Sequence, residues 1–169
     1  MKLFLSFAFT LFLSAAAFAQ TGRIAEDFSA TSMQGATLNL QEQRGKIVVL
    51  TFWSTRCEIC HAEIPKLNLI ADKYASNPNV HFMGLSVENE TKIEAYLRKK
   101  PFKFTIYPNS LGVVLKYAPK DGQGRINMGF PAYVIIDQRG EVVMDTSGWD
   151  KTGKMDATID RLLNSRRAD

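Results

Sequence analysis

One run of residues constrains the fold of this chain more than any other. It reads IVVLTFW, from Ile47 to Trp53, and it follows the turn signal RGK. A strand with one solvated face alternates apolar and polar residues, whereas a strand covered on both faces is apolar throughout. The run is rich in β-branched and aromatic side chains, which favour strands. We therefore predict a central strand here, with other elements packed against both of its faces.

Strand and helix patterns alternate along the rest of the chain. Further strands are expected in VHFMGLSV (80–87), FTIYPN (104–109), FPAYVIID (130–137) and EVVMD (141–145), the last two joined as a hairpin through the turn QRG. Helices are expected at 58–76, 90–100, 110–118 and 152–167. DFSAT (27–31) and ATLNL (36–40) form a small hairpin before the main sheet. This order indicates a three-layer α/β domain with a mixed central sheet.

The first nineteen residues have the pattern of an export signal. Lys2 precedes an apolar stretch from Leu3 to Leu13, and the small residues Ala17 and Ala19 lie at the −3 and −1 positions before Gln20. An uncleaved membrane anchor is the alternative, but the apolar stretch is shorter than the roughly 20 residues that span a bilayer. We expect residues 1–19 to be a cleavable signal peptide. Residues 20–169 then form one domain that works in the periplasm or another extracytoplasmic space.

Charge and cysteine content narrow the possible functions. The chain has 21 Lys and Arg against 17 Asp and Glu, a formal charge of +4, and loss of Lys2 with the signal leaves 20 − 17 = +3. This small surplus includes no basic run, so no nucleic-acid partner is expected. Two cysteines are too few for a disulfide scaffold, and a chain of this length does not need one. A single, closely spaced pair of cysteines in an oxidising compartment indicates a chemical function rather than a structural disulfide.

Both cysteines lie in the segment TRCEICHAEIP, as Cys57 and Cys60, with His61 directly after them. Cys-x-x-Cys is a redox dithiol, whereas Cys-x-x-Cys-His also attaches c-type haem. The pair lies where a buried strand gives way to a helix, and a helix N-terminus favours a thiolate at Cys57. Cys60 falls about one turn inside the helix and can act as the resolving thiol. This placement favours thiol-disulfide exchange.

Two alternatives would use the same residues differently. A haem would consume both thiols, take His61 as one iron ligand and need a second one. The candidates for that second ligand lie in strand-like or turn-like stretches and are better interpreted as core or filler residues: Met83, Met128 and Met144. A zinc ion would require Cys57, Cys60, His61 and His81, but adjacent Cys60 and His61 fit standard ligand spacings poorly. The context therefore favours the dithiol, with no metal.

Glu63 is the most informative neighbour of the pair. Helical spacing places one acidic residue on a stripe that is otherwise apolar or cysteine: Cys60, Glu63, Ile64, Leu67, Ile70, Ala71 and Tyr74. A carboxylate one turn beyond Cys60 can accept the proton of that thiol. The pattern equally allows Glu63 to lie at the edge of the stripe and be solvated. His61 and Arg56 also have two interpretations, as exposed polar residues or as groups that tune the thiolate.

The segment FWSTRCEICHAEIPKLN resembles the active-site region of the TlpA/ResA type of extracytoplasmic thioredoxin-fold proteins. The resemblance covers nearly all of the mature chain, from DFSAT through IVVLTFW to GFPAYVIIDQRGEVV. It implies a thioredoxin fold with an added N-terminal β-hairpin, and the segment from Glu90 to Tyr117 resembles the helical insertion of that family.

The resemblance also implies roles for individual residues. Cys57 matches the attacking thiol and Cys60 the resolving thiol, together a redox-active disulfide. Glu63 matches the acidic residue that handles protons in the ResA-like branch. Pro131 matches the cis-proline that faces the dithiol, and the backbone of Phe130 would pair with a substrate strand. A cis bond at Pro131 is not expected from sequence alone, since only about 5% of X–Pro bonds are cis.

Three features of the sequence depart from the usual pattern. Thr51 stands where ordinary thioredoxins have a buried aspartate, so Glu63 would have to supply its function. Arg56 precedes Cys57 where the family often has tryptophan. Glu58 and Ile59 separate the cysteines, without the usual proline, and this dipeptide influences the redox potential.

The resemblance implies an extracytoplasmic thiol-disulfide oxidoreductase without a cofactor. We expect a monomer that reduces disulfides in other extracytoplasmic proteins, in cytochrome c maturation among other settings, and that is itself reduced by a membrane-bound thiol reductant. The alternatives are a disulfide oxidant or isomerase on the same fold, a c-type haem electron-transfer protein, and a binding domain without turnover.

Overall fold

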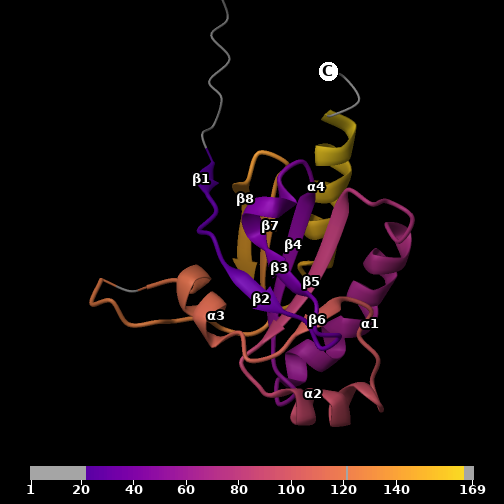
Figure 1. Cartoon of the computed structure of the whole chain (residues 1–169), viewed down its shortest axis with the longest axis vertical. Helices are drawn as coiled ribbons and strands as arrows, with labels where there is room; N and C mark the ends of the chain where they lie inside the picture. Colours follow the sequence, from indigo (N-terminus) through magenta and orange to yellow (C-terminus); the bar gives the residue numbers. More distant parts are fainter. Residues whose placement is uncertain (1–21, 121, 166–169) are drawn as a thin grey trace, which may run out of the picture.

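A computed structural model describes residues 22–120 and 122–165 of the chain. The expected signal peptide, residues 1–19, lies outside the described residues. Six strands form one sheet in the order β1-β8-β7-β4-β5-β6 (Figure 1). Their bounds are β1 (Arg23–Ile24), β4 (Ile47–Trp53), β5 (Val80–Ser86), β6 (Thr105–Tyr107), β7 (Ala132–Ile136) and β8 (Glu141–Ser147). No helix within these described ranges is long and apolar enough to cross a membrane.

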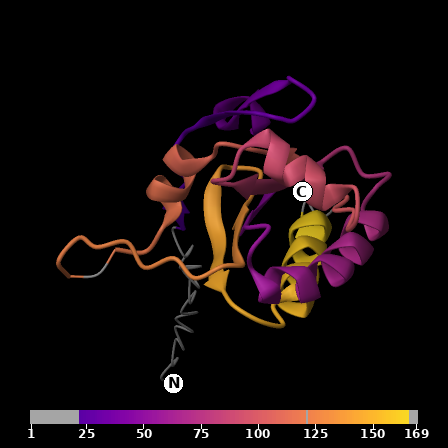
Figure 2. The ribbon, with the colours of Figure 1, turned by 90° about the horizontal axis from the view of Figure 1, so that it is seen from below.

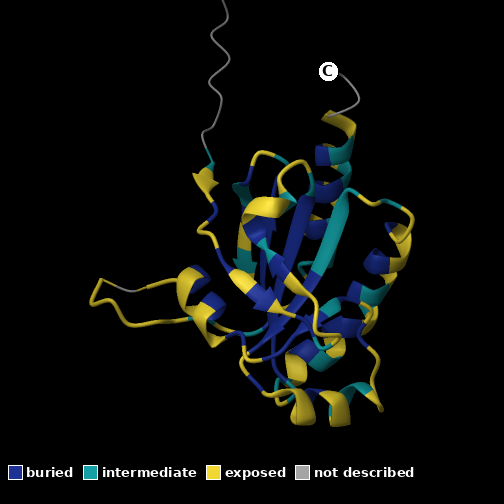
Figure 3. Ribbon diagram, in the orientation of Figure 1, coloured by how far each residue is buried: buried dark blue, intermediate teal, exposed yellow. Residues whose placement is uncertain are grey.

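Strand β4 is the centre of the sheet, as the apolar run predicts. It pairs in parallel with β5 and antiparallel with β7, so the sheet is mixed. All seven of its residues are buried (Figure 3). Val48, Leu50 and Phe52 face one apolar cluster, and Ile47, Val49 and Trp53 face the other. The absence of alternation in the sequence therefore reflects two cores, one on each face of the strand.

Helices and a small second sheet cover the two faces (Figure 2). Helices α1 (Glu58–Lys73) and α4 (Thr152–Ser165) enclose one core. Helix α3 (Leu111–Tyr117) encloses the other, together with the hairpin of β2 (Ser29–Thr31) and β3 (Thr37–Asn39) and the short 3-10 helix η1 (Leu40–Gln43). Helix α2 (Glu90–Leu97) inserts Ile93 into the first core. The predicted three-layer architecture and the separate N-terminal hairpin are confirmed.

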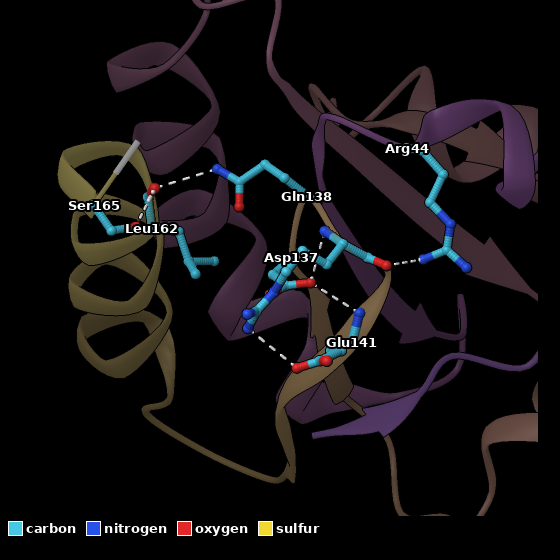
Figure 4. Close-up of polar contacts among 7 residues, drawn as sticks. Arg44, Asp137, Gln138, Glu141, Leu162 and Ser165 are labelled. Atoms are coloured by element: carbon cyan, nitrogen blue, oxygen red, sulfur yellow. Dashed lines mark hydrogen bonds and ion pairs between the residues drawn. The ribbon is translucent and has the colours of Figure 1, made fainter. Parts of the chain in front are cut away.

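The turn between β7 and β8 is held by side chains that the residues QRG alone do not reveal (Figure 4). The carboxylate of Asp137 accepts hydrogen bonds from the backbone N–H groups of Arg139, at 3.0 Å, and Glu141, at 2.8 Å. Gln138 donates from its side chain to the carbonyl of Leu162 in α4, at 3.2 Å. This turn therefore ties the hairpin to the helix that covers one face of the sheet.

Helices α1 and α4 are joined at the end of α1 by a polar cluster around Tyr74. The Tyr74 hydroxyl lies within hydrogen-bond distance of the carboxylates of Asp156 and Asp160, at 2.7 and 2.8 Å, and shares its single proton between them. Lys73 also reaches these two carboxylates, each at 2.8 Å. Burial, followed by the hydrogen bonds to the two carboxylates, holds the pKa of Tyr74 above its ordinary value. The hydroxyl therefore stays protonated at neutral pH and can act as a donor.

Tyr74→Phe is expected to lower the free energy of unfolding by about 1–2 kcal/mol, because it removes the hydroxyl whose proton these two carboxylates share. Tyr96→Phe is a matched control, since the Tyr96 hydroxyl is also buried but has no hydrogen-bond partner among the described residues. Urea unfolding monitored by circular dichroism measures both variants. Equal destabilisation of the two would show that the Tyr74 cluster adds nothing to stability.

Candidate active site

Cys57 caps the N-terminus of α1, directly after strand β4. Its backbone is extended, and its Sγ accepts a hydrogen bond from the backbone N–H of Cys60 at 3.1 Å. The positive end of the helix dipole and this N–H both stabilise negative charge on the sulfur. The fold therefore places Cys57 at a helix N-terminus, as the sequence predicts, and such a position favours a thiolate.

The two cysteines differ in exposure in the way that their proposed roles require. They are joined as a disulfide, with their Cα atoms 5.2 Å apart. Cys57 is half-buried, whereas Cys60 is only 1% exposed and packs into the core between α1 and the sheet. A substrate can therefore reach Cys57 but not Cys60. This asymmetry suits an attacking thiol followed by a resolving thiol.

His61 is turned toward the loop before the helix. Its Nε2 lies 2.9 Å from the carbonyl oxygen of Thr55, and because a carbonyl can only accept, Nε2 carries the proton. The ring also packs against Tyr96 of α2, with centroids 4.8 Å apart. A haem-linked histidine would offer a ring nitrogen to iron, whereas this Nε2 is engaged with Thr55. His61 therefore fits a structural role better than iron ligation.

Glu63 is fully buried, at 0% exposure, so the solvated interpretation of this residue is wrong. Its surroundings are not purely apolar, however. One carboxylate oxygen lies 3.1 Å from Nζ of Lys66, and the other accepts a hydrogen bond from the backbone N–H of Asp150 at 3.2 Å. Lys66 also reaches the carboxylate of Asp150 at 3.2 Å and lies over the ring of Trp149 at 4.6 Å. Glu63 is thus an acceptor held in place by the loop before α4.

Two buried hydroxyls share the layer between the sheet and α1. Thr51 of β4 and Tyr133 of β7 are register partners, and neither hydroxyl has a hydrogen-bond partner among the described residues. Burial raises the pKa of Tyr133, and the negative charge of Glu63 raises it further. The position that holds an aspartate in ordinary thioredoxins therefore has a threonine hydroxyl here, and Glu63 is the carboxylate whose charge acts on its register partner Tyr133.

Pro131 lies at the end of the sheet from which the dithiol projects. The Phe130–Pro131 bond is cis, as the resemblance implies. Ala132, the next residue, is the register partner of Phe52, so Pro131 is level with the end of β4. Phe130 and Cys57 both pack at the border of the same core cluster. The topology therefore brings Pro131 and the dithiol to one edge of the sheet.

Two charged residues near the dithiol were missed in the sequence. Lys66 is the partner of Glu63, and its spacing of three on a helix could have indicated the pair. Glu88 is almost fully buried beyond the end of β5 and binds Thr55 in the dithiol loop. Glu88 follows the carboxyl end of a parallel strand, where α/β proteins hold functional groups. This position in the sequence could have marked it as a site residue.

Comparison with known proteins agrees with this geometry. The AhpC/TSA family model matches residues 21–144. Thioredoxin-like protein YneN of Bacillus subtilis is 27% identical over 125 residues, which cover 73% of this chain and 69% of that protein. Thiol-disulfide oxidoreductase ResA of Bacillus thuringiensis is 27% identical over 130 residues, with 76% and 70% covered.

Solved structures agree at the level of the fold. A thiol:disulfide interchange protein of the thioredoxin family from Chlorobium tepidum superposes with a TM-score of 0.69 at 19% identity, covering 84% of this chain and 97% of that one. The MTB protein dsbF, in its mixed oxidised and reduced forms, gives a TM-score of 0.64 at 26% identity, with 80% and 94% covered.

The matched residues include all six strands of the main sheet, at least in part, and the helix that carries the dithiol. The sheet order, the cis-proline and the cysteine pair at the start of α1 follow the resemblance that the sequence shows. The chain therefore belongs to the AhpC/TSA family, as a ResA-like member with the thioredoxin fold.

Proposed function

We propose that this protein is an extracytoplasmic thiol-disulfide oxidoreductase that reduces disulfides in other proteins. The observation that carries this proposal is the asymmetric pair at the start of α1. Cys57 is accessible and its sulfur accepts a backbone N–H, whereas Cys60 is buried one turn inside the helix. Relatives named thiol-disulfide oxidoreductase support the activity.

The proposed reaction has two exchange steps. The Cys57 thiolate attacks one sulfur of a substrate disulfide, the S–S bond breaks, and one substrate thiolate leaves. Cys60 then gives its proton to Glu63 and attacks the Cys57 sulfur of the mixed disulfide. The second substrate thiolate leaves and the Cys57–Cys60 disulfide forms. Two electrons pass to the substrate, and a thiol reductant must supply two electrons to reset the dithiol.

The proposal also includes the direction of the exchange and the compartment in which it takes place. The ResA-type resemblance implies substrates that include proteins of cytochrome c maturation and a membrane-bound thiol reductant as the electron donor. The export pattern of residues 1–19 supports a reaction in the periplasm or its equivalent. A secreted antigen, MPT53 of Mycobacterium tuberculosis, is 33% identical over 88 residues, which supports an extracytoplasmic site.

An equilibrium titration of the dithiol against glutathione tests this function. We expect a two-electron couple with a potential well below the roughly −240 mV of the glutathione pool, and reduction of a model protein disulfide. A value near about −120 mV, the potential of strong periplasmic oxidants, would assign the opposite direction. A Soret band in the purified protein would instead support the haem alternative.

A further inference from the structure

The loop between β4 and α1 forms a tight turn that presents Cys57. The backbone N–H of Cys57 donates to the carbonyl of Ser54 at 3.2 Å, which closes the four residues Ser54 to Cys57. Thr55 and Arg56 are therefore the central residues of this turn, and such a turn brings its first and last Cα atoms within about 7 Å. Any group bound to the centre of the turn thus holds the segment that leads directly into Cys57.

Glu88 binds the centre of this turn from the loop after β5. Its carboxylate accepts hydrogen bonds from the backbone N–H and the hydroxyl of Thr55, both at 2.7 Å, and from the hydroxyl of Ser86 at 3.3 Å. The carbonyl of Glu88 accepts a further bond from the backbone N–H of Asn109 at 2.9 Å. The Glu88 side chain is only 4% exposed. Glu88 is therefore a buried carboxylate that several hydrogen bonds hold in one position beside the turn.

Glu88 carries its negative charge in the folded protein. Burial alone would favour its neutral form, but the hydrogen bonds from Thr55, Ser86 and Ser54 outweigh burial and hold the pKa of Glu88 below its ordinary value. A fixed negative charge therefore lies beside the turn that ends at Cys57.

Other charged groups surround the same turn. Arg56 faces Glu88 at 3.8 Å with a side chain that is 83% exposed, and it favours a thiolate, but the ion pair partly neutralises it. Glu58, exposed in the first turn of α1, adds negative charge. His61 binds the Thr55 carbonyl. Glu63 lies beyond Cys60 and is paired with Lys66. Among these charged groups, Glu88 is the carboxylate that is both buried and in direct contact with the turn.

We propose that Glu88 is a positioning residue that fixes the Ser54–Cys57 turn and, through its charge, makes the Cys57 thiol harder to ionise. A thiolate next to a fixed negative charge is disfavoured, and a less stable thiolate makes the reduced form less stable relative to the disulfide. Glu88 thereby opposes the effect of the helix dipole on Cys57. It lowers the redox potential of the dithiol, which makes the dithiol a stronger reductant. This inference rests on the proposed thiol-disulfide exchange and explains its direction.

The test measures the ionisation of Cys57 in a Cys60→Ser variant, which leaves Cys57 as the remaining thiol. The ultraviolet absorbance of the thiolate is recorded as a function of pH. Glu88→Gln removes the charge but keeps an acceptor for the Thr55 N–H, and its amide can donate to the Thr55 hydroxyl. We expect this change to raise the ionisation constant of Cys57 on the order of tenfold, as for loss of a like charge at close range. In the protein with both cysteines, the glutathione equilibrium should shift toward the dithiol by a similar factor.

Two further variants separate charge from geometry. Glu88→Asp keeps the charge, so the Cys57 ionisation constant should change less than about twofold even where the loop loosens. Glu94→Gln removes an exposed carboxylate of α2 that pairs with Arg98 at 3.3 Å, and it too should change the constant by less than about twofold. The inference is overturned if Glu88→Gln behaves like the Glu94 control, or if Glu88→Asp shifts Cys57 as far as Glu88→Gln. These titrations involve no substrate, so they test the effect of Glu88 on Cys57 even if the protein fails to reduce any disulfide.

Discussion

Cys60→Ser is expected to trap a stable mixed disulfide between Cys57 and a substrate and to stop turnover. Cys57 is accessible and its thiolate is favoured by the helix N-terminus, so it attacks first, and without Cys60 nothing releases the product. Cys57→Ser should trap little, because the remaining thiol is only 1% exposed. Both variants should lose activity on the order of 10⁴-fold or more, as for removal of a catalytic nucleophile.

Non-reducing electrophoresis and mass spectrometry of each variant after incubation with a disulfide-bonded protein measure the trapped species. Alkylation of the reduced wild-type protein provides the control, since Cys57 should be labelled before Cys60. Faster labelling of Cys60, or equal trapping by both variants, would reverse the assigned order of attack.

Glu63→Gln is expected to slow release of the mixed disulfide on the order of 10²-fold, the low end for loss of a general base. The amide cannot accept the Cys60 proton, while its size and its bond to the Asp150 N–H can be kept. Lys66 loses one carboxylate but retains Asp150 and solvent, so the fold should persist. Removing the negative charge should also lower the pKa of the Cys60 thiol.

Asp72→Asn is the matched control for this change. Asp72 lies on the same helix and also pairs with a lysine, Lys103, at 2.6 Å, but its side chain is 51% exposed and faces away from the core. Single-turnover kinetics should show the slow release only in Glu63→Gln. Wild-type rates and thiol titration in Glu63→Gln would mean that the proton goes to water or to His61.

The fold was predictable because its strongest signals are local. The unbroken apolar run of β4 required two covered faces, and the structure has both. Element ends were less accurate. Helix α1 ends at Lys73, not near Ser76, because the chain leaves the helix at Tyr74. Strand β1 was missed because two residues paired with β8 carry no pattern of their own.

The site was predictable only where its residues lie close together in sequence. Cys57, Cys60 and Glu63 share one helix, and their spacing revealed their relation. Glu88 and Asp150 reach the site from residues 33 and 87 positions away in the chain. No pattern in a single sequence specifies such contacts, since the topology of the sheet creates them. The cis bond at Pro131 was expected from the resemblance and not from the chemistry of the residues around it.

Strand β4 lies between β5 and β7 and between two cores, and this has a consequence for the motions of the site. Amide groups in such a strand exchange with solvent only when the whole domain unfolds, whereas groups at edges and loops exchange through small local openings. The dithiol turn is attached directly to this slowest-exchanging element. The start of the dithiol turn is therefore anchored to the element that opens last, and the motions that align three sulfur atoms are expected in the turn and in the substrate rather than in β4.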